Sequence, residues 1–485
     1  MPQDGRGGGA VVRHRISCWW GLMKANYMVL FVFVIIAYIP RLLLSYLVFA
    51  LGQLLRFCVR LLGVECGRPV ANRRILLITD YLPPQTHGIA IRCQAYAKEL
   101  RAQGHHVVVF ATAYDAAKET SFDHPNIPSV PNPFNLKNRI GYTAGVKLAW
   151  YLGAFTWDVV HLVYPSLIGG FVLSCSAWRG IPTYCSHHVE MEMFSTHAPY
   201  PLDKIGLALY NSATLWPAVH WGTLNAAPTL CFARAHCGTR YPDRLRAVPS
   251  GTHDCFTSQP SHEGERQEVR EARFGVTEND VKVTLMVQRL SKEKGTERVF
   301  PAFAASGEGV AGILAIAGDG PSRETLEQEA RAMGVRAVFL GNVPHHELPS
   351  LYRAADCFVT MSISETYGLT CLEAQMCGCP AVMPYCAVFD EIWSHRVPKE
   401  WRYRVESSKE LACAVVAAQS SGRSYLKEHP VQQTWKDASI ELLSHYEECI
   451  ELNRVRKHRH TRWVTTCAQA TRVICVLALA MYVAS

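Results

Sequence analysis

Short apolar runs alternate with amphipathic segments along the chain from about residue 73. The apolar run 74–80 ends in polar residues, the amphipathic segment 90–103 stops at Gly104, and a second apolar run follows at 106–110. A buried strand, a helix and a second strand in this order form a β-α-β unit, which builds a parallel sheet with helices on both faces. Further strands of this first series are expected at 159–163, 182–186, 230–232 and 244–248.

A second alternating series follows the first. The polar stretch 258–278 lies between them, and we interpret it as the linker between two domains. The elements expected in the second series are strands at 281–287, 310–317, 337–340, 357–360 and 381–384, and helices at 322–333, 370–376 and 435–452.

The two series predict an α/β protein with two consecutive doubly wound, Rossmann-like domains. We place the first domain at 70–262, the second at 275–430 and a closing helix at 431–453. Ligands of such sheets bind beyond the carboxyl ends of the strands, and two facing domains of this kind leave a cleft between them. The binding site is therefore expected in the cleft.

An apolar segment precedes the first domain. Tyr27 to Leu55 is almost wholly apolar, although Pro40 and Arg41 interrupt it and Arg56 ends it. A stretch of about 20 apolar residues can span a bilayer, whereas a charge is costly at the bilayer midplane. A tilted span, a kinked span and an interfacial hairpin all fit this pattern, and we assign 27–62 as a membrane segment.

The two ends of the chain have a different character. Residues 1–26 are rich in Gly and Arg, which predicts a disordered basic tail. Near the other end, a basic run at 454–462 precedes the apolar stretch 463–485. This second stretch fits either a membrane helix or a solvated tail helix.

The composition narrows the class of protein. With 485 residues, 49% hydrophobic and 19% charged, the chain is long and apolar enough for two packed domains. The net charge of +8 lies mostly in the tails, which favours an anionic membrane surface over nucleic acid as partner. Its 18 cysteines form no Cys-x-x-Cys pair and no Asn-x-Ser/Thr site occurs, which favours a reducing, cytosolic side for the globular part.

The strongest chemical signal is the stretch 364–374, in which seven residues separate Glu365 from Glu373. Carboxylates accept hydrogen bonds from sugar and ribose hydroxyls. The backbone amides of Gly368, Leu369 and Thr370 stand at the expected start of a helix, where a diphosphate is favoured. An ordinary helix with acidic residues near its first turn would show the same spacing.

Other stretches accompany this signal. Arg289 and Lys294 lie in the loop 288–295 after the first strand of the second domain, from which both could reach a diphosphate. A solvated basic turn is the alternative interpretation. The tight turn 318–321 and the segment 352–356 complete the set.

The four stretches 289–295, 318–321, 352–356 and 365–374 occur in an order that resembles the second domain of the retaining GT-B glycosyltransferases of family 4, also called glycosyl transferases group 1. The first domain resembles the same family in its opening strand, its loop ending in Gly88, and the sequence Gly-His-His-Val that begins at Gly104. Within the family, the chain is most similar to sulfoquinovosyltransferases and related lipid glycosyltransferases. The stretches that carry this finer resemblance are 128–131, 158–161 and 182–188.

The resemblance implies roles for the donor site. Glu365 would act in catalysis by holding the hydroxyls of the donor sugar, and Glu373 would bind the ribose. Arg289 and Lys294 would neutralise the departing diphosphate. Gly88 would let backbone amides approach the donor phosphates.

The resemblance also implies a catalytic histidine, His188, although His187 replaces the aromatic residue usual before it and leaves open which of the two acts. Retention of configuration would follow from attack on the leaving-group side, with the donor phosphate taking the proton. No Asp-x-Asp motif is present, so we expect no required metal ion. We also expect no cofactor, since the nucleotide-diphosphate sugar is a substrate.

The expected function is transfer of a hexosyl group from a nucleotide-diphosphate sugar, such as a UDP-sugar, to a membrane lipid such as diacylglycerol. The catalytic domains would face the cytosol, or the stroma in a plastid-type membrane. A GT-B transferase with a non-lipid acceptor, a sugar-nucleotide epimerase and a non-catalytic membrane scaffold are the alternatives. A dehydrogenase is disfavoured because neither domain opens with Gly-x-Gly-x-x-Gly.

Two departures from the family pattern leave the identity of the sugar open. The segment 384–391 lacks the usual Gly-Gly pair near the donor hexose. The segment 250–254 stands where Gly-x-Asp is usual.

Overall fold

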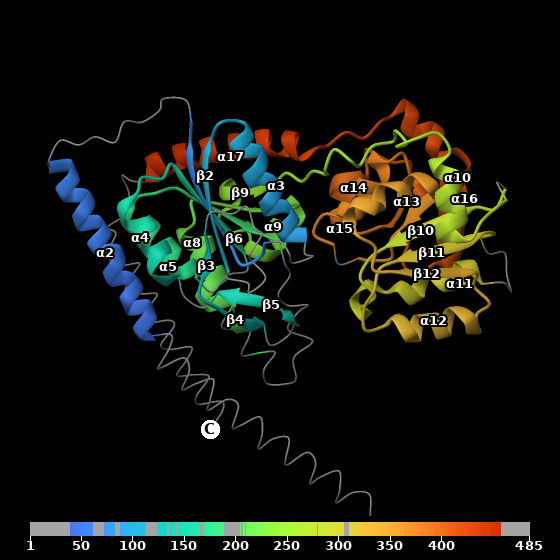
Figure 1. The fold of residues 1–485 in the computed structure, drawn as a ribbon, viewed down its shortest axis with the longest axis horizontal. Helices are drawn as coiled ribbons and strands as arrows, with labels where there is room; N and C mark the ends of the chain where they lie inside the picture. The colour runs from blue at the N-terminus through green and yellow to red at the C-terminus, as the bar shows by residue number, and fades with distance from the viewer. Residues whose placement is uncertain are drawn as a thin grey trace, which may run out of the picture.

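A computed structural model shows two α/β domains side by side (Figure 1). It describes residues 39–61, 72–82, 88–112, 124–132, 135–141, 144–164, 168–188, 204, 207–208, 210–278, 280–304, 310–363 and 365–456. The predicted basic tail 1–26 and the apolar stretch 463–485 lie outside the described residues. The predicted fold class, two Rossmann-like domains in the GT-B arrangement, is confirmed.

The first domain is built on a seven-stranded sheet in the order β3-β2-β1-β6-β7-β8-β9. All neighbours in this sheet are parallel. Its strands are β1 (Arg74–Thr79), β2 (His106–Thr112), β3 (His124–Ile127), β6 (Val159–Tyr164), β7 (Thr183–His187), β8 (Leu224–Ala227) and β9 (Leu245–Ala247). An antiparallel hairpin of β4 (Ser129–Asn132) and β5 (Asn135–Gly141) accompanies the sheet.

Helices cover both faces of this sheet. Side chains alternate across a strand, so Ile75 and Leu77 of β1 enter one core with α3, while Leu76 and Ile78 enter the other with α4 and α5. The helices of the first domain are α2 (Ile39–Leu61), α3 (Gly88–Ala102), α4 (Gly145–Ala154), α5 (Gly169–Arg179), the π-helix η3 (Asn211–Leu215), α8 (Trp216–Trp221), α9 (Leu230–Cys237) and the 3-10 turn η4 (Pro242–Arg244).

The strand expected at 230–232 is wrong, because these residues begin the helix α9. The Thr229 hydroxyl accepts a hydrogen bond from the Phe232 N–H at 3.4 Å, which caps the helix. The strand of this region is β8, which lies just before α9 in the chain. All four of its residues are buried. A three-residue apolar run is too short to distinguish a strand from the first turn of a capped helix.

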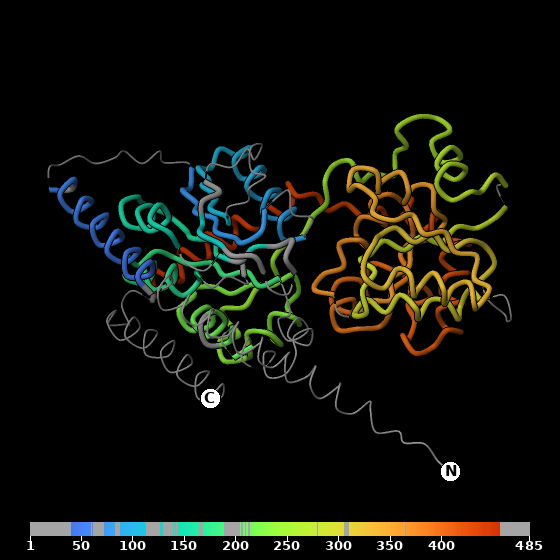
Figure 2. Tube along the Cα trace, turned by 60° about the horizontal axis from the view of Figure 1, so that its bottom comes forward, coloured from blue at the N-terminus to red at the C-terminus, as the bar shows by residue number. Residues whose placement is uncertain are grey.

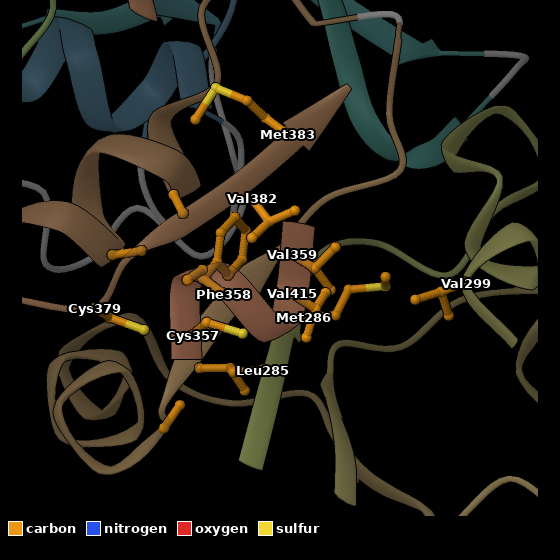
Figure 3. Close-up of a cluster of buried hydrophobic side chains, with 14 of the residues drawn as sticks. Leu285, Met286, Val299, Cys357, Phe358, Val359, Cys379, Val382, Met383 and Val415 are labelled. Atoms are coloured by element: carbon orange, nitrogen blue, oxygen red, sulfur yellow. The ribbon is translucent and has the colours of Figure 1, made fainter. Parts of the chain in front are cut away.

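The second domain has a six-stranded parallel sheet in the order β12-β11-β10-β13-β14-β15. Figure 3 shows how side chains of its central strands, among them Leu285, Cys357, Phe358 and Val382, meet in the core. The strands are β10 (Val283–Val287), β11 (Ile313–Ala317), β12 (Ala337–Gly341), β13 (Cys357–Val359), β14 (Ala381–Pro384) and β15 (Arg402–Tyr403).

The polar stretch 258–278 is not a linker but part of the second domain. Glu265 forms a two-pronged ion pair with Arg353 at 2.7 and 2.8 Å, and Phe274 is buried in the core of this domain. The helices and turns of the domain are α10 (Glu265–Val269), η5 (Arg270–Phe274), η6 (Lys292–Lys294), η7 (Thr296–Val299), α11 (Phe300–Phe303), α12 (Arg323–Ala332), η8 (His345–Glu347), α13 (Leu348–Ala354), α14 (Leu369–Met376), α15 (Ala387–Trp393), η9 (Lys399–Trp401) and α16 (Ser408–Glu428).

The chain crosses between the domains twice, and the two crossing segments lie side by side. Thr252 pairs with Thr434 in a parallel bridge, and the Trp435 N–H donates to the Thr252 carbonyl at 3.1 Å. The last described helix, α17 (Trp435–Arg456), then returns to the first domain, as Figure 2 shows. Its Leu442 and Tyr446 are buried in the same core as α3, so the C-terminal helix belongs structurally to the first domain.

Candidate functional site

The two domains meet at the residues predicted to bind the donor phosphates. A Cβ atom added to Gly88 of the first domain would lie 3.9 Å from Leu369 Cδ1 of the second. Gly88 is the first residue of α3, and Leu369 is the first residue of α14. Two helix N-termini, one from each domain, therefore face the same interdomain region.

The start of α14 depends on Gly368. This residue has φ +84°, and a Cβ there would lie 2.5 Å from the Phe389 ring. The first helical bonds are donated by residues 371 and 372 to the Gly368 carbonyl, so the amides of Gly368, Leu369 and Thr370 precede the intrahelical bonds of α14. This arrangement can bind an anion, and a diphosphate at this position stays a prediction.

Two of the predicted site residues form an ion pair. Lys294 Nζ lies 2.5 Å from Glu365 Oε1 and 3.4 Å from Ser362 Oγ. Both side chains are partly exposed, Lys294 at 24% and Glu365 at 23%. Arg289 lies in the same loop but is exposed to solvent. The structure thus joins Lys294 to Glu365 and leaves Arg289 at the surface.

Glu373 lies inside α14 and is held through both of its oxygens. The Tyr352 hydroxyl donates to Oε2 at 3.2 Å, and His345 Nε2 lies 2.9 Å from Oε1. Burial raises the pKa of Tyr352 well above its ordinary value, so the phenol keeps the proton that it donates. Each carboxylate oxygen has a second lone pair available for a ribose hydroxyl.

Sequence reasoning assigned no role to His345 or Tyr352. His345 follows the carboxyl end of β12, a position at which ligands of parallel sheets often bind. That position was the one signal that could have singled it out. Tyr352 belongs to a stretch that matched the family, but nothing in the stretch indicated its contact with Glu373.

The two adjacent histidines have different surroundings. His187 ends β7 and its Nε2 lies 3.0 Å from the Asn225 side-chain oxygen. Burial, with the neighbouring His236, lowers the pKa of His187 to about 3. His188 follows the strand, and its Nε2 lies 3.0 Å from Ser186 Oγ. These contacts favour a core role for His187 and leave His188 as the better candidate for catalysis.

A chain of buried hydrogen bonds connects His188 to the C-terminal helix. Ser186 Oγ lies 2.8 Å from His161 Nε2, and His161 Nδ1 lies 2.7 Å from the Tyr446 hydroxyl of α17. Burial, with the charge of Arg92, lowers the pKa of His161 to about 3, so its ring is neutral. A neutral imidazole donates at one nitrogen and accepts at the other, so His161 donates to one of its two hydroxyl partners and accepts from the other. Ser186 and His161 thereby link His188 to Tyr446.

The neutral histidines predict a loss of stability in acid. The pKa of His161 is about 3 in the fold and ordinarily about 6.5 in an unfolded chain. Between these values the unfolded state binds more protons, so the stabilisation is complete above pH 6.5 and decreases as the pH falls. Lowering the pH from 7.5 to 5.5 should cost about 1.4 kcal/mol through His161 alone.

Urea unfolding of the first domain at the two pH values checks this expectation. In His161→Gln the titrating group is absent. The decrease in the free energy of unfolding between pH 7.5 and 5.5 should therefore be smaller than in the wild-type protein by about 1.4 kcal/mol. Equal losses in the two proteins would contradict the assignment of a neutral His161.

The segment that departs from the family pattern forms an interdomain contact. Residues 387–393 are the helix α15 of the second domain. The Glu391 carboxylate of this helix accepts hydrogen bonds from the Leu230 and Cys231 N–H groups at 2.6 and 2.7 Å. These amides belong to the start of α9 in the first domain, so Glu391 caps that helix across the interface.

Two doubly wound domains that face each other across such a site define the GT-B class of glycosyltransferases. The family model for glycosyl transferases group 1 matches residues 268–422, and the model for glycosyltransferase family 4 matches residues 86–254. The chain belongs to this family, as its motifs predicted, and is a hexosyltransferase.

Curated relatives and solved structures agree with this assignment. An alpha-monoglucosyldiacylglycerol synthase of Streptococcus pneumoniae is 26% identical over 314 residues, which cover 64% of this chain and 70% of that protein. A sulfoquinovosyl transferase of Arabidopsis thaliana is 25% identical over 319 residues, 64% of this chain and 59% of that one. The Anabaena protein Alr3699/HepE, solved with UDP and glucose, has a TM-score of 0.54 at 17% identity, over 78% of this chain and 100% of that chain.

Proposed function

We propose that this glycosyltransferase moves a hexosyl group from a UDP-sugar to a lipid such as diacylglycerol, with retention of configuration. The binding of the donor rests on one observation: Gly88 of the first domain lies against Leu369 at the start of α14, and the Lys294–Glu365 pair belongs to the same domain as this helix. The lipid half is supported by the relatives named for glucosyldiacylglycerol synthesis and sulfoquinovosyl transfer. The UDP moiety is supported by the complex of Alr3699/HepE.

In this proposal the diphosphate binds at the amides of Gly368 to Thr370 and pairs with Lys294. Lys294 would exchange Glu365 for the phosphate, which frees a Glu365 oxygen for hydroxyls of the donor sugar. Arg289 would approach from the surface. The protein then acts by positioning the reactants and by stabilising negative charge that develops on the leaving phosphate.

The remaining roles follow from the contacts of each side chain. Glu373, oriented by His345 and Tyr352, would bind the ribose hydroxyls. His188, coupled to Ser186, would stand beside the reacting sugar. The acceptor hydroxyl attacks on the side from which the diphosphate leaves, and its proton passes to the donor phosphate.

A panel of labelled nucleotide sugars tests the proposal. Purified protein would be incubated with each donor in the presence of vesicles that contain diacylglycerol, or with soluble sugar acceptors instead. We expect label from a UDP-sugar in the lipid phase. Label only in soluble acceptors would identify a non-lipid transferase, interconverted free donor an epimerase, and no product with any donor a non-catalytic scaffold.

We also predict that a chelator leaves transfer largely intact. Among the residues that the structure describes, no group of three or more His, Cys, Asp or Glu side chains is placed to hold a metal ion. Basic side chains and helix amides can bind the diphosphate instead. Initial rates with and without excess EDTA check the prediction, and a complete loss that Mg²⁺ or Mn²⁺ restores would contradict it.

A further inference from the structure

The apolar helix α2 is docked along the first domain. The backbones of α2 and α4 approach closely at Gly52 and Gly153, where a Cβ on Gly153 would lie 2.6 Å from the Phe49 carbonyl oxygen. Gln53 Nε2 donates to the Gly153 carbonyl at 2.5 Å, and Phe49 is only 5% exposed. The middle of α2 is therefore packed against protein.

A second helix of the domain extends the contact toward the start of α2. The Tyr46 hydroxyl lies 2.8 Å from Ser174 Oγ of α5, and the Tyr46 ring packs edge-on against Phe171 at 4.8 Å. Ser45 is also buried. Positions 45, 46, 49, 52 and 53 recur every three or four residues, so they form one face of the helix. We call these five positions the docked face.

The opposite face of α2 is apolar and exposed. Its residues Leu47 and Leu51 are 56% and 50% exposed, one helical turn apart. Soluble monomers rarely expose a continuous apolar patch of this length. The leucine face, as we call it, consists of Leu43, Leu44, Leu47, Leu51, Leu54, Leu55, Phe57 and Leu61.

The charged residues of α2 and of the two helices against which it packs have one sign. The helices α2, α4 and α5 contain no Asp or Glu. Their charged residues are Arg41, Arg56, Arg60, Lys147 and Arg179. A purely basic set of charges on helices that include an exposed apolar face complements the headgroups of anionic lipids, whereas a water-soluble protein partner would not require this bias.

Docking also limits how the chain can meet a bilayer. Pro40–Val59 is long and apolar enough to cross a membrane by composition. A crossing helix, however, would carry the packed faces of α4 and α5 into the lipid. Upstream of α2, the uncharged stretch between Lys24 and the helix is 25–38, which has fourteen residues, fewer than the roughly 17–25 that a spanning helix needs.

We propose that α2 lies flat on an anionic membrane, with its leucine face in the lipid and its docked face on the first domain. The two domains and α2 then stay on one side of the bilayer, and α2 fixes the orientation of the first domain relative to the surface. The inference goes beyond the proposed function, and its tests measure contact and topology without any sugar transfer.

Lipid photolabelling of the full chain tests the contact. Vesicles of phosphatidylcholine and phosphatidylglycerol would carry a photoactivatable phospholipid, and the labelled peptides would be mapped by mass spectrometry. We expect label on the leucine face and none on Phe49. Val416 and Ile440, about as exposed at 50% and 54% on α16 and α17, are the matched controls and should stay unlabelled. Label on both faces of α2, or none on α2, would overturn the proposal.

A pair of variants gives an independent measurement. Leu47→Glu combined with Leu51→Glu should reduce the fraction of protein that floats with these vesicles at least fivefold, while Ile440→Glu should not change it. The substitutions lie on an exposed face, so circular dichroism should show an intact fold. Unchanged flotation of the double variant would overturn the proposal. If light scattering showed that the wild-type protein is a dimer and the double variant a monomer, the leucine face would instead be a contact between two copies of the chain.

Protease digestion on sealed vesicles distinguishes a helix that lies flat on the membrane from one that spans it. An epitope before residue 1 and the globular domains should both be digested by protease added to one side of sealed vesicles. Protection of the epitope while the domains are digested would show that α2 crosses the bilayer and would overturn the proposal.

Discussion

Replacing Lys294 by alanine is expected to lower kcat/KM for the nucleotide sugar by about 10²-fold or more. A decrease of this size is expected because the variant loses a positive charge that stabilises the leaving phosphate in the transition state. Lys294 is held beside Glu365 at 2.5 Å, so its ammonium group is already oriented. The variant should retain its melting temperature within a few degrees, because both partners are partly exposed.

The neighbouring Lys292 supplies the matched control. It lies in the same short turn, η6, but is exposed and has the same charge. Lys292→Ala should change kcat/KM less than about threefold, a size typical of an exposed charge. Initial rates at several donor concentrations measure both variants. Wild-type turnover in Lys294→Ala, or equal losses in the two variants, would show that Lys294 does not bind the leaving group.

Replacing His188 by alanine should give the second large effect, a decrease in kcat of about 10²- to 10⁴-fold. His188 lies one residue beyond the end of β7 and is not part of that strand, so the fold should survive. The adjacent His187→Ala should instead lower the melting temperature, because it removes a buried partner of Asn225. The contrast between two neighbouring substitutions decides which histidine acts.

Ser186→Ala tests whether the buried chain of hydrogen bonds positions His188. Removing the Ser186 hydroxyl breaks the hydrogen-bonded connection from His188 to His161 and Tyr446. We expect a fall in kcat with a shifted pH–rate profile and little change in KM, because the proposed donor contacts of the second domain are unchanged. A loss of stability with an unchanged kcat and pH profile would indicate a merely structural role for Ser186.

The sheets could be predicted from the sequence for a simple physical reason. Strands of a parallel sheet are buried on both faces and therefore appear as continuous apolar runs, as in β1 and β10. The strand wrongly predicted at 230–232 and the linker wrongly predicted at 258–278 are segments whose structure depends on side-chain contacts and not on a continuous apolar run. Thr229 caps a helix through one side chain, and the Arg353–Glu265 pair anchors a polar stretch to a distant part of the second domain. Composition does not reveal either contact.

The candidate site also has a part that the sequence predicts and a part that depends on the tertiary structure. Glu365, Glu373 and the start of α14 belong to one continuous stretch, so their spacing places them without further information. Their partners come from elsewhere: Lys294 from the loop after β10, and His345 from the loop after β12. Those distances depend on strand order, and the pairing of β10 with both β11 and β13 is a property of the whole sheet.

The amino-acid sequence alone determined the fold class, the family and the candidate donor site, because each depends on local burial or on residues close together in the chain. It determined that the segment after Tyr27 is apolar, but not which way its side chains face. Only the tertiary structure showed that Phe49 and Gly52 pack on α4 while Leu47 and Leu51 stay exposed. Whether an apolar helix crosses a membrane or lies on it depends on what else it contacts, and those contacts come from residues about a hundred positions away.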